Sequence, residues 1–141
     1  MTADRSYLLD SSAVLAWLFR EPGGVMVEPV LTRSWMTTVN LAEVLRRAEA
    51  RGYLRSSHEL AADLGALISL EDVVAETDAK RCAELVQVSY AQRDKRKTPT
   101  LSLGDGMCIA VAERLELPVM TSDRAWKDLE DLFRIEVVLI R

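Results

Sequence analysis

The feature that most constrains the fold of this chain is a set of five short apolar runs, each separated from the next by a longer segment. Runs of this length between turn residues are typical of buried strands. Strands that alternate with helices favour βαβ units, a mainly parallel sheet and helices on both faces. We therefore predict an α/β fold. The predicted strands are residues 6–9, 35–39, 72–74, 119–121 and 135–140.

The segments between these runs show helical periodicity. In residues 41–48 and 108–115 apolar side chains recur at i, i+3, i+4 and i+7, so each segment has one stripe that packs against a sheet. Residues 11–19 are apolar nearly all round, which is typical of a deeply buried helix. Two further helices are expected at residues 56–69 and 78–97.

Length and composition narrow the class of protein. A chain of 141 residues with 49% apolar side chains fits a single domain, residues 1–141. No uncharged stretch exceeds nine residues, so we expect no membrane span, and the charged N-terminal segment predicts a cytoplasmic protein. Cys82 and Cys108 lack the spacing of a zinc site or a disulfide framework and are expected to be reduced, buried thiols.

Four acidic residues lie at or just beyond the ends of predicted strands. Ligands of open α/β sheets bind at this edge, so the four carboxylates are expected to share one cleft. Hard divalent cations such as Mg²⁺ or Mn²⁺ prefer carboxylate oxygens, and such an ion suits phosphodiester hydrolysis. The predicted ligands, which are also the candidate catalytic residues, are Asp10, Glu43, Asp105 and Asp123.

Local structural roles compete with this interpretation for three of the acids. The segments Asn40 to Glu43 and Ser102 to Asp105 both have the capping-box pattern, in which the acid bonds back to the first residue. Glu43 also lies nearly opposite the apolar stripe of its predicted helix. Asp123 has an alternative role as N-cap of a following short helix.

Asp10 is a stronger candidate because it stands directly between an apolar strand and an apolar helix. An acid buried there is costly unless a cation or several donors compensate its charge. The competing role is an N-cap for residues 11–19, but Ser11 and Ser12 can provide that cap without any charge.

Four segments together resemble the PIN-domain proteins of the VapC toxin type. They occur in the family's order over nearly the whole chain, whereas residues 56–97 match only in helical character. The four segments are residues 8–18 (LLDSSAVLAWL), 37–44 (TTVNLAEV), 101–112 (LSLGDGMCIAVA) and 117–126 (LPVMTSDRAW).

This resemblance implies a three-layer α/β/α sandwich with a parallel sheet in strand order 3-2-1-4-5. It also implies a Mg²⁺- or Mn²⁺-dependent endoribonuclease that is the toxin of a toxin–antitoxin pair. The expected partners are an RNA substrate, an inhibitory VapB-type antitoxin and a second copy of the chain in a homodimer. All four candidate acids match acids of the family, with Ser11 and Thr121 as supporting polar residues.

Two other functions remain open from the residues alone. A phosphoryl-accepting receiver-type α/β domain also uses acids at strand ends and Mg²⁺, but it needs a lysine at a late strand end, and Lys127 follows Asp123 within a helix instead. A non-catalytic regulatory module with the same fold is the second alternative.

Two clusters of basic residues, at 46–55 and 93–97, are candidates for contacts with RNA or an acidic partner. The second cluster is also explained by favourable charges at a helix C-terminus. The net charge of −4 equals the charge of the four proposed ligands, so the acidic composition does not argue against RNA binding.

Overall fold

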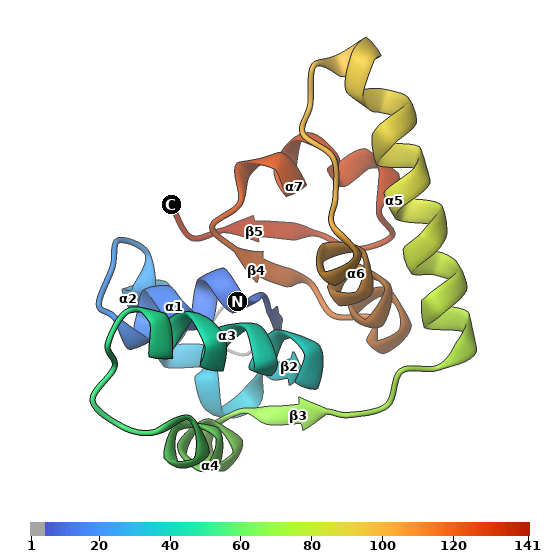
Figure 1. The fold of residues 1–141 in the computed structure, drawn as a ribbon. Coiled ribbons are helices and arrows are strands. Elements are labelled where there is room, and N and C mark those ends of the chain that lie inside the picture. Colours follow the sequence, from blue (N-terminus) through green and yellow to red (C-terminus); the bar gives the residue numbers. More distant parts are fainter. Residues whose placement is uncertain (1–4) are drawn as a thin grey trace.

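The computed structural model describes residues 5–141 and has one five-stranded sheet at its centre (Figure 1). Every neighbouring pair of strands is parallel, and the strand order is β3-β2-β1-β4-β5. The predicted α/β fold and strand order are therefore confirmed. The strands are β1 (Leu8–Leu9), β2 (Trp35–Thr37), β3 (Ser69–Glu71), β4 (Val119–Thr121) and β5 (Val137–Leu139).

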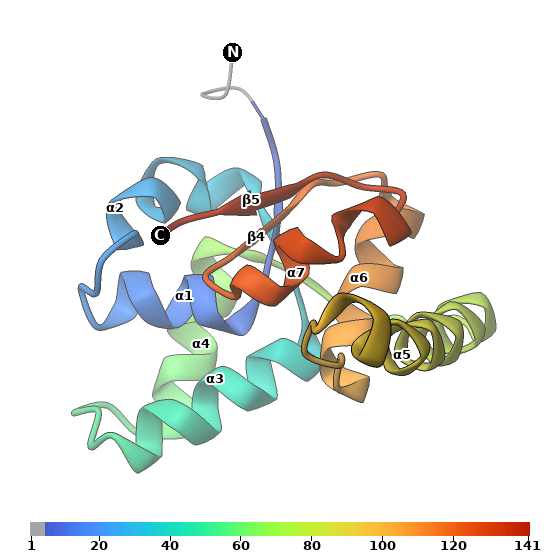
Figure 2. The same ribbon diagram turned by 90° about the horizontal axis from the view of Figure 1, so that it is seen from above.

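Helices cover both faces of this sheet, as Figures 1 and 2 show together. Helices α1 to α4 contribute to the core on one face, and α5 to α7 contribute to the core on the other. The helices are α1 (Ser11–Leu18), α2 (Gly24–Val27), α3 (Thr38–Ala50), α4 (Ser57–Leu67), α5 (Glu76–Arg96), α6 (Leu103–Leu115) and α7 (Arg124–Asp128), with 3-10 turns η2 (Glu28–Arg33) and η3 (Glu130–Leu132).

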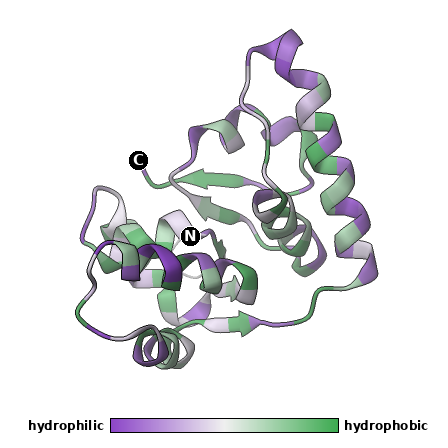
Figure 3. Cartoon of the chain, viewed as in Figure 1, coloured by the Kyte–Doolittle hydropathy of each residue, from purple (hydrophilic) through white to green (hydrophobic). Residues whose placement is uncertain are grey.

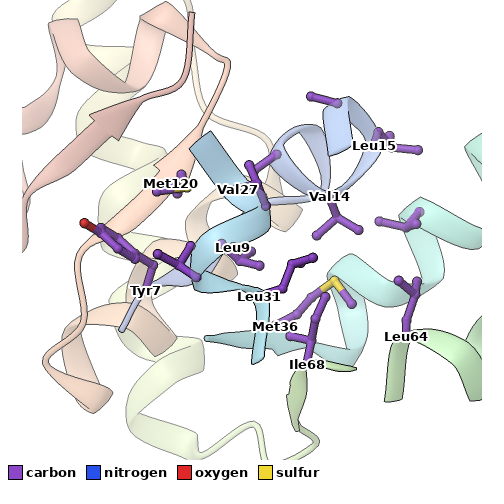
Figure 4. Close-up of a cluster of buried hydrophobic side chains, with 14 of the residues drawn as sticks. Tyr7, Leu9, Val14, Leu15, Val27, Leu31, Met36, Leu64, Ile68 and Met120 are labelled. Atoms are coloured by element: carbon purple, nitrogen blue, oxygen red, sulfur yellow. The ribbon is translucent and has the colours of Figure 1, made fainter. Parts of the chain in front are cut away.

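Alternation along the strands divides the interior into two cores. Leu8 packs against α5, α6 and α7, whereas the next residue, Leu9, packs against α1 to α4 (Figure 4). Val119 and Met120 of β4 divide between the two cores in the same way. Successive side chains of a strand point to opposite faces, so a sheet covered on both sides needs apolar residues at every position. This explains why β4 and β5 are mostly hydrophobic in Figure 3.

The third strand and two short helical elements in the first half of the chain differ from the prediction. The third strand is Ser69–Glu71 and not residues 72–74. Val73 and Val74 are 56% and 45% exposed, so this apolar pair is a surface feature and did not mark a buried strand. The sequence pattern also does not predict α2 and η2, because each is too short to show a helical period.

The prediction of buried, free cysteines is confirmed in the described residues. Cys82 and Cys108 are both free and buried. Within residues 5–141, no helix is long and apolar enough to cross a membrane.

Replacing either of two helical glycines by alanine should change the stability of the protein, in opposite directions. A Cβ at Gly24 would lie 2.5 Å from the carbonyl oxygen of Ala16, whereas a Cβ at Gly65 would have Leu70 Cδ1 at 3.7 Å as its nearest neighbour. Gly24→Ala should lower the free energy of unfolding by about 1–3 kcal/mol because the backbone of α1 must move. Gly65→Ala should raise it by about 0.5–1 kcal/mol through helix propensity. Urea unfolding of both variants tests this pair, and a stabilising Gly24→Ala would contradict it.

Candidate active site

A pocket of about 260 Å³ opens at the carboxyl end of the sheet. Because the strands are parallel, their carboxyl ends meet at one edge, and the residues that follow them come together there. All four acids that the sequence singled out line this pocket. Its lining residues are Asp10, Ser11, Ser12, Glu43, Arg47, Asp105, Ser122 and Asp123.

Asp10 is the most deeply placed of these acids. It directly follows the central strand β1, and only 7% of its surface is exposed. It stands at the N-cap position of α1, but its side chain makes no capping hydrogen bond. Instead, its Oδ2 accepts hydrogen bonds from Ser12 Oγ at 2.7 Å and Thr121 Oγ1 at 2.8 Å. Capping therefore does not account for this carboxylate.

The two hydroxyl groups are oriented by the backbone that follows β4. The N–H of Ser122 donates to Ser12 Oγ at 3.0 Å, and the N–H of Asp123 donates to Thr121 Oγ1 at 3.1 Å. Each hydroxyl accepts from the backbone and has one proton of its own, which it donates to Asp10. Thr121 was expected beside the acids, but the serine that contacts Asp10 is Ser12. Ser11, which the sequence favoured, is buried and lines the pocket.

The environment of Asp10 raises the pKa of its carboxyl group from 3.8 to about 6. Burial is the main cause, and the hydrogen bonds from Ser12 and Thr121 oppose it. The negative charges of Asp105 and Glu43 raise the pKa further. The pocket therefore holds a carboxylate whose charge the surrounding protein compensates only in part.

Asp105 combines the predicted capping role with a position in the lining of the pocket. It forms a capping box with Ser102, in which the N–H of Ser102 donates to Asp105 Oδ2 and the N–H of Asp105 donates to Ser102 Oγ, both at 3.1 Å. The same side chain lines the pocket. Its pKa is raised, chiefly by burial and also by the charges of Asp123 and Glu43.

Glu43 does not belong to a capping box with Asn40, as the pattern had suggested. Helix α3 begins earlier, and its N-cap is Thr37, whose hydroxyl accepts a hydrogen bond from the N–H of Asn40 at 3.0 Å. Glu43 therefore lies beyond the first turn. Its carboxylate faces the pocket and forms an ion pair with Arg47 at 2.9 Å.

Asn40 instead connects two of the helices that carry the acids. Its side chain is buried, and Nδ2 donates to Cys108 Sγ at 3.2 Å. Glu43 lies about one turn after Asn40 in α3, and Asp105 lies about one turn before Cys108 in α6. This contact therefore links the two helices at a point about one turn from each of two candidate ligands. The sequence did not reveal it, because neither residue type indicates a contact across 68 positions.

Asp123 is the most exposed of the four acids. It is the N-cap of α7, as its alternative interpretation predicted, and its Oδ1 accepts a hydrogen bond from the N–H of Ala125 at 2.9 Å. It also lines the pocket, so capping and a position beside the other acids are compatible here too.

The donor chemistry of the pocket suits a hard divalent cation, because its four acids offer only oxygen atoms. Within residues 5–141, however, no three His, Cys, Asp or Glu side chains are arranged as a metal site. Glu43, Asp105 and Asp123 each have a local partner, so a bound cation would compete with these partners for the carboxylates.

The chain matches a known family model in sequence and several solved structures in fold. The family model described as the PIN domain matches residues 7–132. No curated protein sequence matches the chain.

Solved structures that share this fold include several VapBC proteins. VapBC-1 from nontypeable Haemophilus influenzae has a TM-score of 0.66 and 14% identity, covering 96% of this chain and 98% of that chain. VapBC-5 from Mycobacterium tuberculosis, a member of the VapBC family of toxin–antitoxin systems, gives 0.62 and 22%, with coverages of 95% and 98%. The DNA-bound VapBC from Salmonella typhimurium gives 0.60 and 17%, with coverages of 97% and 99%. At these identities the likeness is one of fold.

The raised pKa of Asp10 predicts that this carboxylate destabilises the folded protein. The folded carboxyl group holds its proton more tightly than the unfolded one, so rising pH lowers stability through this group. Asp10→Asn keeps an oxygen for the two hydroxyls and removes the charge. Without divalent cations, it should raise the free energy of unfolding by about 1–3 kcal/mol at about pH 8.

Urea unfolding at about pH 8 and about pH 4.5 measures this effect, and the gain should shrink at the lower pH. Asp72→Asn is the matched control, because Asp72 is exposed and does not line the pocket. A gain of equal size at both pH values, or the same gain in the control, would refute the prediction.

Proposed function

This chain belongs to the PIN-domain family, and on that premise we propose that it is a Mg²⁺- or Mn²⁺-dependent endoribonuclease, the toxin of a toxin–antitoxin pair. The observation that carries the proposal is the convergence of four acids from four separate segments on one pocket. At an effective dielectric constant near 20, two carboxylates about 5 Å apart repel by roughly 3 kcal/mol. A bound cation would convert this repulsion into attraction. The acids are Asp10, Glu43, Asp105 and Asp123.

Asp10 would be the innermost ligand of the cation. Ser12 and Thr121 both contact its Oδ2, and no hydrogen bond among residues 5–141 reaches its Oδ1. The two hydroxyls thus fix the orientation of the carboxylate and leave one oxygen available. Since a ligand held in advance needs little rearrangement, Asp10 would define where the cation binds.

The three outer acids would complete the ligand set from the walls of the pocket. Glu43 and Asp105 come from α3 and α6, which the buried contact of Asn40 with Cys108 joins. Asp123 comes from the turn after β4. When bound, Mg²⁺ or Mn²⁺ would polarise the phosphodiester, help to activate water and offset the charge of the leaving oxygen.

The partners are part of the same proposal. Three structural neighbours are VapBC proteins, and the one from Mycobacterium tuberculosis is described as a member of a toxin–antitoxin family. By this likeness we propose that a VapB-type antitoxin binds and inhibits the chain, that the chain forms a homodimer, and that it acts on RNA in the cytoplasm.

A cleavage assay tests the proposed activity. Purified protein with Mn²⁺ should cut an end-labelled pool of randomised single-stranded RNA, and EDTA should stop the reaction. Asp105→Asn should abolish cleavage because it removes a ligand oxygen and a charge from the pocket. Asp72→Asn, which changes an exposed acid outside the pocket, should retain full activity.

The same assay tests the substrate and the non-catalytic alternative. A DNA pool of matching sequences should resist cleavage if the enzyme is specific for RNA. Undiminished cleavage by folded Asp105→Asn would refute the proposed mechanism. If the folded wild type cuts neither nucleic acid with Mg²⁺ or Mn²⁺, the protein is better described as a non-catalytic binding module.

Metal binding gives a prediction that does not depend on catalysis. A cation that binds only the folded state stabilises it, by about 2.7 kcal/mol at a free concentration 100 times Kd. Millimolar Mn²⁺ should therefore raise the melting temperature of the wild type, and Asp10→Asn should lose most of this shift. Calorimetry with and without Mn²⁺ measures it. An equal shift in the two proteins would show that the cation binds elsewhere.

A further inference from the structure

Arg47 is the one cationic side chain, among residues 5–141, that lines the acidic pocket. It belongs to the basic cluster at 46–55, which the sequence offered as a candidate RNA surface. The structure separates the members of that cluster. Arg51 pairs with Glu21 and stacks on Phe19 at 3.9 Å, so its guanidinium group is already engaged away from the pocket.

Arg55 is also engaged elsewhere. It forms ion pairs with Glu59 and Asp63 of α4. Arg46 is exposed, does not line the pocket and forms no ion pair with the described residues. The position of Arg47 therefore distinguishes it from its neighbours.

Arg47 can leave its ion pair with Glu43 for another partner at small cost in stability. The two residues are four positions apart on α3, and their side chains are 49% and 32% exposed. Exposed ion pairs of this spacing contribute little to stability because water screens them. Arg47 can therefore change partner at small cost, while Glu43 stays within reach of the pocket.

We propose that Arg47 exchanges Glu43 for the RNA backbone when a cation binds to the acids, and that it is a substrate-binding residue of this nuclease. The inference rests on the proposed function. A cation at Glu43 competes with the guanidinium group for the same carboxylate oxygens. The released guanidinium group then lies beside the site where the scissile phosphate must bind.

The chemistry of the guanidinium group suits this exchange. Carboxylate and phosphate both accept two parallel N–H hydrogen bonds from arginine, so one side chain serves both partners. A pocket lined by four carboxylates repels an RNA phosphate unless positive charge is added. Arg47 supplies such a charge in addition to that of the cation, at the rim of the pocket and on a rigid helix.

Two opposite effects of one substitution test the proposal. Arg47→Gln frees Glu43 from competition, so the affinity for Mn²⁺ should rise about twofold or more. The same variant lacks the contact with phosphate, so kcat/KM for RNA cleavage should fall about tenfold or more. Isothermal titration with Mn²⁺ alone measures the first effect, and initial rates on the randomised RNA pool measure the second.

Arg46→Gln is the matched control. It removes the same charge from the adjacent position of α3, so general electrostatic effects on Mn²⁺ and RNA are shared by both variants. Compared with Arg46→Gln, Arg47→Gln should therefore show both the higher Mn²⁺ affinity and the lower kcat/KM. Arg47→Lys should recover part of the RNA cleavage, because lysine also binds phosphate but without the paired hydrogen bonds.

The outcomes distinguish this proposal from the proposed function. Equal Mn²⁺ affinities or equal kcat/KM values for the Arg47 and Arg46 variants would overturn the exchange. A loss of both Mn²⁺ binding and cleavage in Arg47→Gln would make Arg47 a structural residue. If the wild type binds Mn²⁺ without cutting RNA, the proposed function fails, yet the Mn²⁺ affinities of the two variants still decide whether Arg47 competes for Glu43.

Discussion

The candidate site depends on one electrostatic constraint, the burial of the Asp10 carboxylate at the end of the central strand. Two hydroxyl groups, from Ser12 and Thr121, supply the hydrogen bonds that this carboxylate receives from the protein. Those hydroxyls are themselves oriented by backbone N–H groups that follow β4. The pairing of β1 with β4 thus determines the orientation of the deepest acid. Its pKa of about 6 shows that the protein alone does not fully compensate the charge.

Most of the fold could be predicted from the apolar pattern. Strands with both faces buried appear as short continuous apolar runs, and β4 was placed at its observed bounds. The third strand was misplaced because β3 lies at the edge of the sheet and is less buried than the central strands, while Val73 and Val74 remain exposed beyond it. An edge strand has neighbours on one side only, so its sequence is less constrained.

The candidate site was harder to derive, because its geometry depends on contacts between distant segments. The sequence drew attention to the four acids by their places after strands, and the structure brings them to one pocket. The sequence did not show that Thr37 caps α3. Because Thr37 is the cap, the side chain of Asn40 is free to contact Cys108. Nor did it show that Ser12 contacts Asp10, since a pattern does not say which of two adjacent serines faces an acid.

The sequence separation within the site also determines when it can form. Asp10 is made before its hydroxyl partner Thr121, which follows 111 residues later, and β1 obtains its second neighbour only with β4. A nascent chain still lacking β4 has neither this hydroxyl nor Asp123. The pocket is therefore completed only after residues 119–123 have been made, and chains released before that point by the ribosome lack an assembled site.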